Sequence, residues 1–335
     1  MGRFAVLALI LAIAGAAQAN DTEAVLGAGG LTFAKSAALR MESEDLRLSR
    51  REVHVAYVFR NLSDRPVTAR IAFPLPDVDV GDMSETPHRF HLAGRDGDIV
   101  NFRLIVDGRE RPASLEARAV NMQGRDVTEL LRRFGIPLIG VRSEDEVDRA
   151  LNRLTPAAVK TLVTADAVYA DEWKTPGDVK HPAWRVKAAY HWVQTFPARA
   201  EVRIEHRYAP VLGGLPSIPA RDVTAAKLAG EGVRPDERRG WCLNPALARE
   251  ASGPDTRRPM SLAWLEYVLH TGASWAGPIG HFRLVIAADP KGVASACPVP
   301  GLVLQRQAGS LTAERADFTP SSDIAVLFLS PRMVR

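Results

Sequence analysis

The sequence contains little cysteine and, after its first residues, no long apolar segment. Only two of its 335 residues are cysteines, Cys242 and Cys297, and neither belongs to a Cys-x-x-Cys pair. A structural zinc site needs four tetrahedral ligands, so no such site is expected on these two residues. A membrane-spanning helix needs about 20 consecutive apolar residues. No later segment provides them, and the sequence therefore predicts a chain that does not span a membrane.

Motifs for catalysis and cofactor binding are also missing. Residues 272–276 (GASWA) lack the last glycine of the Gly-x-Ser-x-Gly elbow of serine hydrolases. Residues 27–30 (GAGG) follow no predicted strand and lack the third glycine of a dinucleotide-binding turn. The eight histidines do not cluster along the sequence, whereas metal ligands and catalytic bases need convergent partners. We therefore predict no cofactor, no metal ligand and no catalytic residue.

The N-terminus has the three parts of a secretory signal. Arg3 provides a positive start, residues 4–17 are apolar, and residues 17–19 (AQA) form a small-x-small site followed by a polar residue. This order predicts cleavage between Ala19 and Asn20 and export to the periplasm of a bacterium or beyond. A buried N-terminal helix or a retained anchor is the alternative. Export argues against nucleic acid as the partner.

Export also bears on the two cysteines, because paired thiols oxidise in such compartments and persist as disulfides. We predict a bond between Cys242 and Cys297, which lie 55 residues apart. On the chain-entropy model this bond contributes about 3–4 kcal/mol to stability. Two unrelated buried thiols are the alternative.

Size and charge are those of an ordinary globular protein. Loss of residues 1–19 leaves about 316 residues, more than one hydrophobic core usually organises, so two domains are expected. Hydrophobic residues make up 46% and charged residues 24% of the chain, and the formal net charge is +4. A mildly basic, solvated surface is favoured, with weak attraction to anionic lipid or cell-wall polymer as the alternative.

Alternating apolar residues predict strands in the first part of the mature chain. These strands cover residues 53–60, 67–73, 102–106, 186–196 and 202–208. Asp107-Gly108 is a strong hairpin turn, and residues 213–216 (GGLP) are expected to end the block. His206 shares the apolar face of its strand, which favours a hydrogen-bonded core histidine.

A helical block of residues 124–168 interrupts these strands. Residues 126–129 and 143–146 have the Asp/Ser-x-x-Glu pattern of a capping box, each ahead of apolar residues at helical spacing. Thr155-Pro156 starts a third short helix. We interpret the block as an insertion that packs on the β domain.

The second part of the chain has a sparser pattern. Residues 262–269 are ambiguous between strand and helix, whereas residues 282–286 and 324–329 predict strands. Together the patterns predict a mainly β fold with two β-sandwich-like domains. The first covers residues 20–215 and carries the helical insertion, and the second, smaller domain covers residues 216–335 and contains the disulfide.

Two surface features suggest ligands without fixing one. Asp77, Asp79, Asp82 and Glu85 form an acidic stretch of the kind that binds hard cations such as calcium. Its spacing does not fit an EF-hand loop, so an acidic surface loop is favoured. All six tryptophans lie from Trp173 onwards. An exposed set would suit carbohydrate or peptide binding, but core packing is the preferred interpretation.

Seven strings, taken together, resemble a family of exported bacterial proteins known as domain of unknown function 4424. They are residues 26–31 (LGAGGL), 41–46 (MESEDL), 72–77 (AFPLPD), 194–198 (QTFPA), 206–210 (HRYAP), 271–280 (TGASWAGPIG) and 318–320 (FTP). The resemblance covers nearly the whole mature chain and implies an exported protein of this architecture, without an activity. The first region also resembles, more faintly, the VIT domain, a β-sandwich that precedes adhesive domains. That similarity rests on the turn at Asn61, on residues 73–76 and on Asp107-Gly108, and by analogy it favours an interaction module.

The strand pattern and the missing catalytic motifs predict an exported envelope protein that acts as a non-enzymatic binding or structural module. Its expected partner is an unidentified envelope protein or a cell-wall glycan. The alternative is a periplasmic hydrolase whose His, Asp, Glu or Ser side chains converge only in three dimensions. A calcium-stabilised, adhesin-like module is a third hypothesis.

Overall fold

The computed structural model describes most of the chain from residue 22 onwards. The described residues are 22–27, 30–34, 36–81, 98, 100–140, 146–169, 181–223, 242–243, 245–253, 255, 257–307 and 310–331. The predicted cleavage site at Ala19 and Asn20 lies outside these residues, as do Asp82, Glu85 and Trp173.

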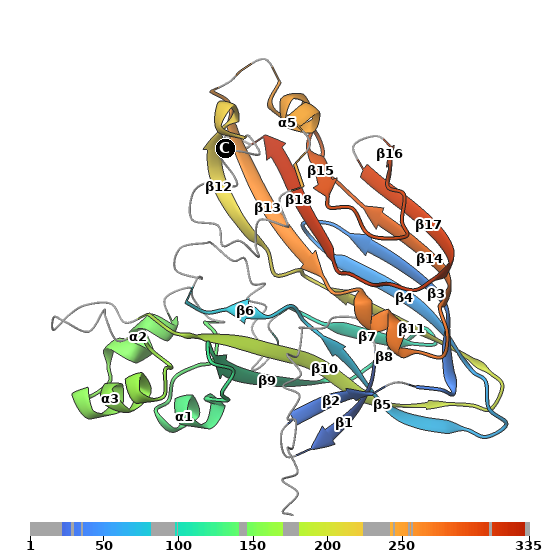
Figure 1. The fold of residues 1–335 in the computed structure, drawn as a ribbon, viewed down its shortest axis with the longest axis horizontal. Helices are drawn as coiled ribbons and strands as arrows, with labels where there is room; N and C mark the ends of the chain where they lie inside the picture. The colour runs from blue at the N-terminus through green and yellow to red at the C-terminus, as the bar shows by residue number, and fades with distance from the viewer. Residues whose placement is uncertain are drawn as a thin grey trace, which may run out of the picture.

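Strands dominate the described part of the chain and form three sheets there (Figure 1). The six-stranded sheet contains β2 (Gly30–Ala34), β1 (Thr22–Gly27), β5 (Val67–Pro74), β10 (Trp184–Phe196), β6 (Val78–Asp79) and β9 (Ser114–Asn121). The eight-stranded sheet runs in the order β16 (Gln305–Gln307), β17 (Ser310–Phe318), β14 (Ile279–Ile286), β3 (Leu39–Leu48), β4 (Val53–Asn61), β11 (Glu201–Tyr208), β7 (Arg103–Val106) and β8 (Arg109–Arg111). The four-stranded sheet runs β12 (Gly213–Pro219), β13 (Pro259–Tyr267), β18 (Ile324–Pro331) and β15 (Val293–Ala296). The predicted mainly β fold is confirmed.

Strands from both halves of the chain share the eight-stranded sheet. β14 pairs in parallel with β3, which is itself antiparallel to β4. The sheet therefore continues across residue 215, where the sequence predicts a domain boundary. The division into two domains stays a prediction.

One face of the eight-stranded sheet packs against both other sheets. Along β4 the buried residues alternate with half-buried ones, as a strand with one core-facing side requires. Phe59 of β4 contacts Phe196 of the six-stranded sheet, with ring centroids 6.0 Å apart. Tyr57, two residues earlier, has its hydroxyl 3.3 Å from that of Tyr267 in the four-stranded sheet. This shared face forms the main hydrophobic core.

His206 lies fully buried in this core. Aromatic rings surround its imidazole, with centroids 5.0 Å away for Phe73, 5.1 Å for Phe102 and 5.2 Å for Trp192. The prediction that His206 belongs to the core is confirmed.

The helical block appears where it is predicted, as α1 (Thr128–Arg133), α2 (Glu146–Asn152) and α3 (Pro156–Thr164). These helices lie at one end of the six-stranded sheet, next to β9 (Figure 1). The Trp184 indole N–H donates to Leu138 O (2.8 Å), and the Asn121 amide donates to Ala165 O (2.8 Å). The block is therefore held to the sheet by part-buried polar contacts as well as by its apolar faces.

Several segments differ from expectation, among them β3 and β17, which no predicted strand covers. Residues 213–216 do not end the first block as a turn, because they open strand β12, which pairs with β13. A Cβ atom on Gly213 would lie 2.0 Å from the Trp264 indole. Glycine is needed at this position for close approach to a large ring, rather than for a turn. The ambiguous segment 262–269 is mostly strand, within β13. A helix that the sequence pattern missed, α5 (Pro245–Ser252), and two 3-10 turns, η3 (Ala220–Asp222) and η5 (His270–Ser274), complete the described elements.

No helix in the described part of the chain combines the length and apolar character that crossing a membrane would need.

Candidate functional site

An open groove of about 830 Å³ lies between the β7–β8 hairpin and the second half of β10. One side is formed by the hairpin and the start of β9, and the other side by β10 and its neighbour β5. The lining residues are Arg70, Val106, Asp107, Arg109, Arg111, Pro112, Ser114, His191, Trp192, Val193, Gln194 and Thr195. We call this the cationic groove, because its lining residues include three arginines and a single carboxylate, that of Asp107.

The hairpin fixes two of these arginines. Asp107 and Gly108 both have positive φ, 47° and 76°, which is the conformation of the predicted tight hairpin turn. The Asp107 carboxylate accepts a hydrogen bond from the backbone N–H of Arg203 (2.9 Å) and is thus engaged in holding the turn. The hairpin prediction is confirmed, and the turn directs β8 along the groove.

The two faces of β8 carry side chains of opposite charge. Arg109 and Arg111 line the groove, whereas Glu110 between them points away and pairs with Arg103 through two hydrogen bonds of 3.1 and 3.2 Å. Successive side chains of a strand point to opposite faces, so the strand presents its cations on one side and its anion on the other. Arg109 and Arg111 are exposed and make no ion pair with any described residue.

Arg70 and His191 form the inner end of the groove. Nη1 of Arg70 lies 3.0 Å from Nδ1 of His191. Burial lowers the pKa of His191, and the neighbouring Arg70 charge lowers it further, against a smaller opposing effect of Glu116. The imidazole is therefore neutral at neutral pH and accepts a hydrogen bond from the guanidinium. Arg70 has no carboxylate partner among the described residues and adds an uncompensated positive charge.

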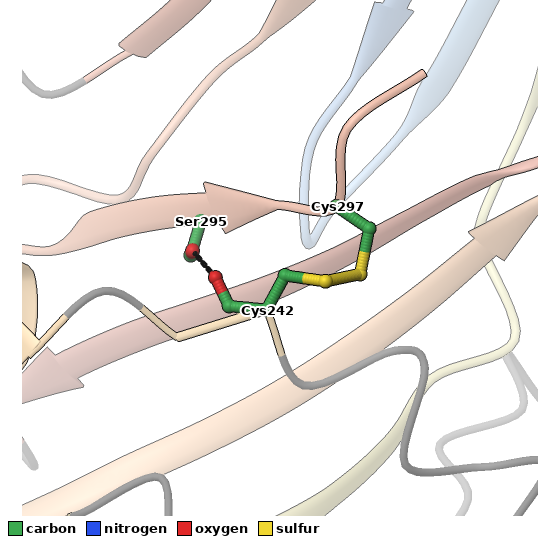
Figure 2. Close-up of a disulfide and its surroundings, with 3 residues drawn as sticks. All are labelled: Cys242, Ser295 and Cys297. Atoms are coloured by element: carbon green, nitrogen blue, oxygen red, sulfur yellow. Dashed lines mark hydrogen bonds between the residues drawn. A yellow bond between two sulfur atoms is a disulfide. The ribbon is translucent and has the colours of Figure 1, made fainter. Parts of the chain in front are cut away.

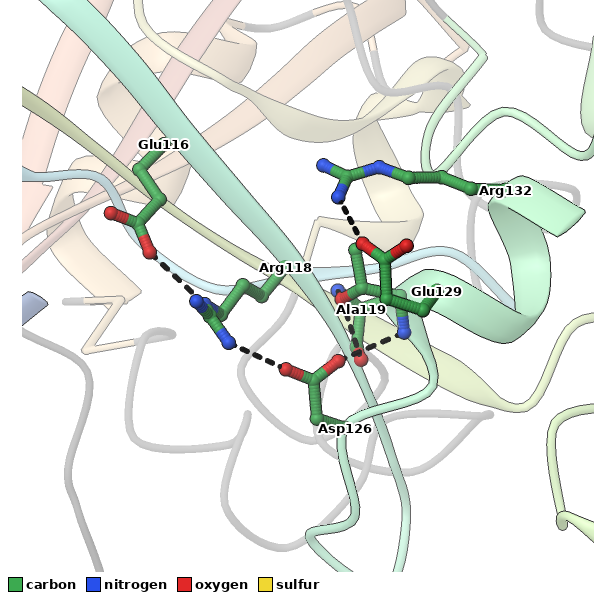
Figure 3. A network of polar contacts seen from close by, with 7 residues as sticks. Glu116, Arg118, Ala119, Asp126, Glu129 and Arg132 are labelled. Atoms are coloured by element: carbon green, nitrogen blue, oxygen red, sulfur yellow. Dashed lines mark hydrogen bonds and ion pairs between the residues drawn. The ribbon is translucent and has the colours of Figure 1, made fainter. Parts of the chain in front are cut away.

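A second hollow of about 540 Å³ lies on the other side of His191, over β9 and α1. Figure 3 shows that its charges pair with one another: Arg118 bridges Glu116 (3.0 Å) and Asp126 (2.8 Å), and Arg132 contacts Glu129 (2.5 Å). We call it the paired hollow. Its arginines are already matched by carboxylates, so it is a weaker site for an anion than the cationic groove.

Asp126 belongs to this network and also serves the helix start. Burial raises its pKa, but hydrogen bonds from Thr128 and Arg118 outweigh burial and leave the pKa below its usual value. Its carboxylate accepts from the Thr128 backbone N–H at 2.8 Å, while Glu129 turns to Arg132 instead of reaching back. The N-cap of α1 is Val127, without a side-chain cap hydrogen bond, so the predicted capping box of Asp126 and Glu129 does not form.

The structure joins Cys242 and Cys297 by a disulfide (Figure 2). Cys297 follows β15, and the Ser295 hydroxyl of that strand donates to the Cys242 carbonyl. The bond ties the segment before α5 to the edge of the four-stranded sheet. It lies in a different sheet from the cationic groove and has a structural place in the fold.

The described part of the acidic stretch is neutralised by β10. Asp77 pairs with Lys187 at 2.9 Å and Asp79 pairs with Arg185 at 3.3 Å. Both carboxylates therefore have cationic partners. Within the described residues, no group of three or more His, Cys, Asp or Glu side chains is arranged to hold a metal ion.

His270 and Asp323 form a histidine–carboxylate pair of the kind found in catalytic sites. Nδ1 of His270 lies 2.6 Å from Oδ1 of Asp323. The same oxygen also accepts from the backbone N–H groups of Leu269 (3.0 Å) and His270 (3.3 Å) at the start of η5. His270 has no other hydrogen-bond partner among the described residues. The pair is explained as the cap of a short turn.

A family model described as "Domain of unknown function (DUF4424)" matches residues 19–327. The chain belongs to this family. No curated protein matches the sequence. Among solved structures, the DUF4424 chain is similar to a crystal structure of a proposed nutrient binding protein from Legionella pneumophila subsp. pneumophila str. Philadelphia 1. The two share 16% identity and a TM-score of 0.42 over 94% of this chain and 70% of that one. The similarity of the first region to the VIT domain stays a prediction.

Sequence reasoning missed the groove because its residues come from separate strands. Arg70 lies on β5, Arg109 and Arg111 on β8, and His191 on β10. The only local signal was the Arg-Glu-Arg string directly after the Asp107-Gly108 turn. Alternation in an edge strand would have placed both arginines on one face.

Proposed function

We propose that this protein is an exported, non-enzymatic binding protein of the bacterial envelope that holds an anionic ligand in the cationic groove. The observation that carries the proposal is the set of Arg70, Arg109 and Arg111, three arginines that line one groove without a carboxylate partner among the described residues. Guanidinium groups bind carboxylates and phosphates through paired N–H donors. The partner is an acidic envelope protein or an anionic cell-wall glycan.

Binding is tested by titrating the purified protein with hexaglutamate in a calorimeter, at low and high salt. We expect binding that weakens as salt rises, because the groove is open to solvent. The variant Arg109→Ser/Arg111→Ser should weaken it about fivefold, since each exposed ion pair contributes modestly.

The matched control is Arg257→Ser/Arg315→Ser, which removes two exposed arginines that make no ion pair with a described residue. It should leave the affinity unchanged. Equal weakening by both double variants, or no binding of hexaglutamate at all, would show that the groove is not an anion site.

Export has its own test. The disulfide supports an oxidising compartment, and N-terminal sequencing of the protein from cells should give a chain that begins at Asn20. A native protein that retains Met1 and is found with cytosolic proteins would contradict this part of the proposal.

A further inference from the structure

The inner wall of the cationic groove is an open strand edge. β10 pairs with β5 as far as Phe196, opposite Val67. On its other side β10 pairs with β9 only as far as His191, opposite Ser114. Residues 192–196 therefore have a strand on one side and the groove on the other, over about 16 Å of backbone.

The direction of the free backbone groups follows from the register. The Leu75 backbone N–H donates to Ala188 O, so residue 188 directs its backbone groups towards the β5 side. In an antiparallel ladder this direction alternates along the strand, and the pairing with β5 continues without a shift. Val193 and Thr195 therefore direct their backbone N–H and C=O groups into the groove. The Thr195 carbonyl accepts a hydrogen bond from the Gln194 side-chain amide (2.7 Å), which an added strand would replace.

The edge lacks the usual protection. Native proteins cover exposed edges or place Lys, Pro or a bulge on them, because a bare edge recruits other strands. Residues 192–195 are Trp-Val-Gln-Thr, without charge or proline, and Val193 is 59% exposed. No described strand continues the line of β9, because the chain turns away at Pro112 towards β8.

The wall facing this edge is positively charged. Arg109 and Arg111 are two residues apart on β8, so their side chains are spaced by about 7 Å. An extended peptide that lies along β10 repeats its own side chains with the same spacing. Acidic residues at alternate positions of such a peptide would face the two arginines in turn.

We infer that the groove takes an extended, acidic peptide segment of a partner protein, which adds a strand to β10 at Val193 and Thr195 and directs alternate carboxylates to Arg109 and Arg111. The inference rests on the proposed function and names the ligand class and its mode of binding. Backbone pairing supplies affinity for any extended peptide, and the arginines select the acidic ones.

The test uses a six-residue acetylated peptide, TEVETV, and two N-methylated forms of it. One form is methylated at the odd positions and the other at the even positions. In an added strand only one of these two sets of N–H groups faces β10. We expect one methylated peptide to bind about tenfold more weakly than the parent and the other to bind within about twofold, because only the first loses hydrogen bonds to the protein.

A protein variant tests the same contact from the other side. Val193→Pro removes the backbone N–H of residue 193, which faces the groove. This N–H makes no hydrogen bond to β5, so the substitution leaves the pairing between β10 and β5 intact. It should weaken TEVETV about fivefold, whereas the control Val303→Pro, at a valine that is 78% exposed and outside the strands, should not. If Val193→Pro fails to fold, the methylated peptides still decide, because they leave the protein unchanged.

Three outcomes would overturn the inference. If the two methylated peptides bind alike while hexaglutamate still binds, the strand pairing is wrong and the anion site stands. If a sulfated glycan such as heparin binds and TEVETV does not, the ligand is not a peptide. If neither TEVETV nor hexaglutamate binds, the inference and the proposed function both fall.

Discussion

Arg50 connects two sheets that the chain builds from distant segments, and its removal gives a quantitative test of the fold. It lies in the turn between β3 and β4. Nη1 is 3.0 Å from Asp289 Oδ2 and 2.6 Å from Ser330 Oγ, and Nη2 is 3.1 Å from Ser261 Oγ. The partners Ser330 and Ser261 belong to β18 and β13 of the four-stranded sheet.

Three hydrogen bonds to a charged group would contribute up to about 1.5–3 kcal/mol each if fully buried. The side chains of Arg50 and Asp289 remain 18% and 27% exposed, so water replaces part of each bond in the variant. We therefore expect Arg50→Ala to lower the free energy of unfolding by about 3 kcal/mol in total.

Urea unfolding, followed by tryptophan fluorescence, measures this difference. Arg51→Ala is the matched control, because Arg51 is the exposed next residue and its side chain has no partner among the described residues. It should change the stability by less than about 0.5 kcal/mol. If the free energies of unfolding of the two variants differed by less than about 0.5 kcal/mol, the view that Arg50 connects the sheets would be refuted.

The remaining predictions concern the disulfide, the groove histidine and a helix cap. Reduction of the Cys242–Cys297 bond should lower the free energy of unfolding by about 4 kcal/mol, because the bond closes a 55-residue loop. Urea unfolding with and without dithiothreitol measures this, and an unchanged urea midpoint in dithiothreitol would contradict the prediction. The pKa of His191, measured by NMR, should lie below that of a free histidine, about 6.5, and should rise in Arg70→Gln. With a lowered pKa, the folded state binds fewer protons than the unfolded state near the pKa. The contribution of His191 to stability is therefore complete above pH about 6.5 and is lost as the pH falls through the folded-state pKa. A His191 pKa that does not respond to Arg70→Gln would contradict the contact between the two side chains. Thr155→Ala should cost about 1 kcal/mol in thermal unfolding, because the Thr155 hydroxyl accepts from the Ala158 backbone N–H at the start of α3, and Thr155→Ser should cost much less.

Local patterns predict the elements of this fold well. The alternation in β4 gives the strand, its length and its buried face. The Asp107-Gly108 pair gives the hairpin, and the Thr155-Pro156 start gives α3. Each depends on neighbours within a few residues, where backbone geometry and side-chain direction are coupled.

Long-range pairing is what the sequence leaves open. No predicted strand covers β3, and no local pattern shows that β14, more than 200 residues later, pairs with β3 in parallel. Gly213 suggests a turn until the Trp264 ring is known to lie against it. The cationic groove has the same origin, since three strands (β5, β9 and β10) and the β7–β8 hairpin must assemble before its arginines meet.

Hydrogen exchange with and without hexaglutamate tests the central claim, that the cationic groove is the binding site, most directly. Mass spectrometry of the digested protein should show slower exchange on ligand addition in peptides that cover residues 107–114 and 190–196. Peptides from β17, which carries the control residue Arg315, should not change. Protection confined to other surfaces, or unchanged exchange in both groove segments at saturating ligand, would contradict the account.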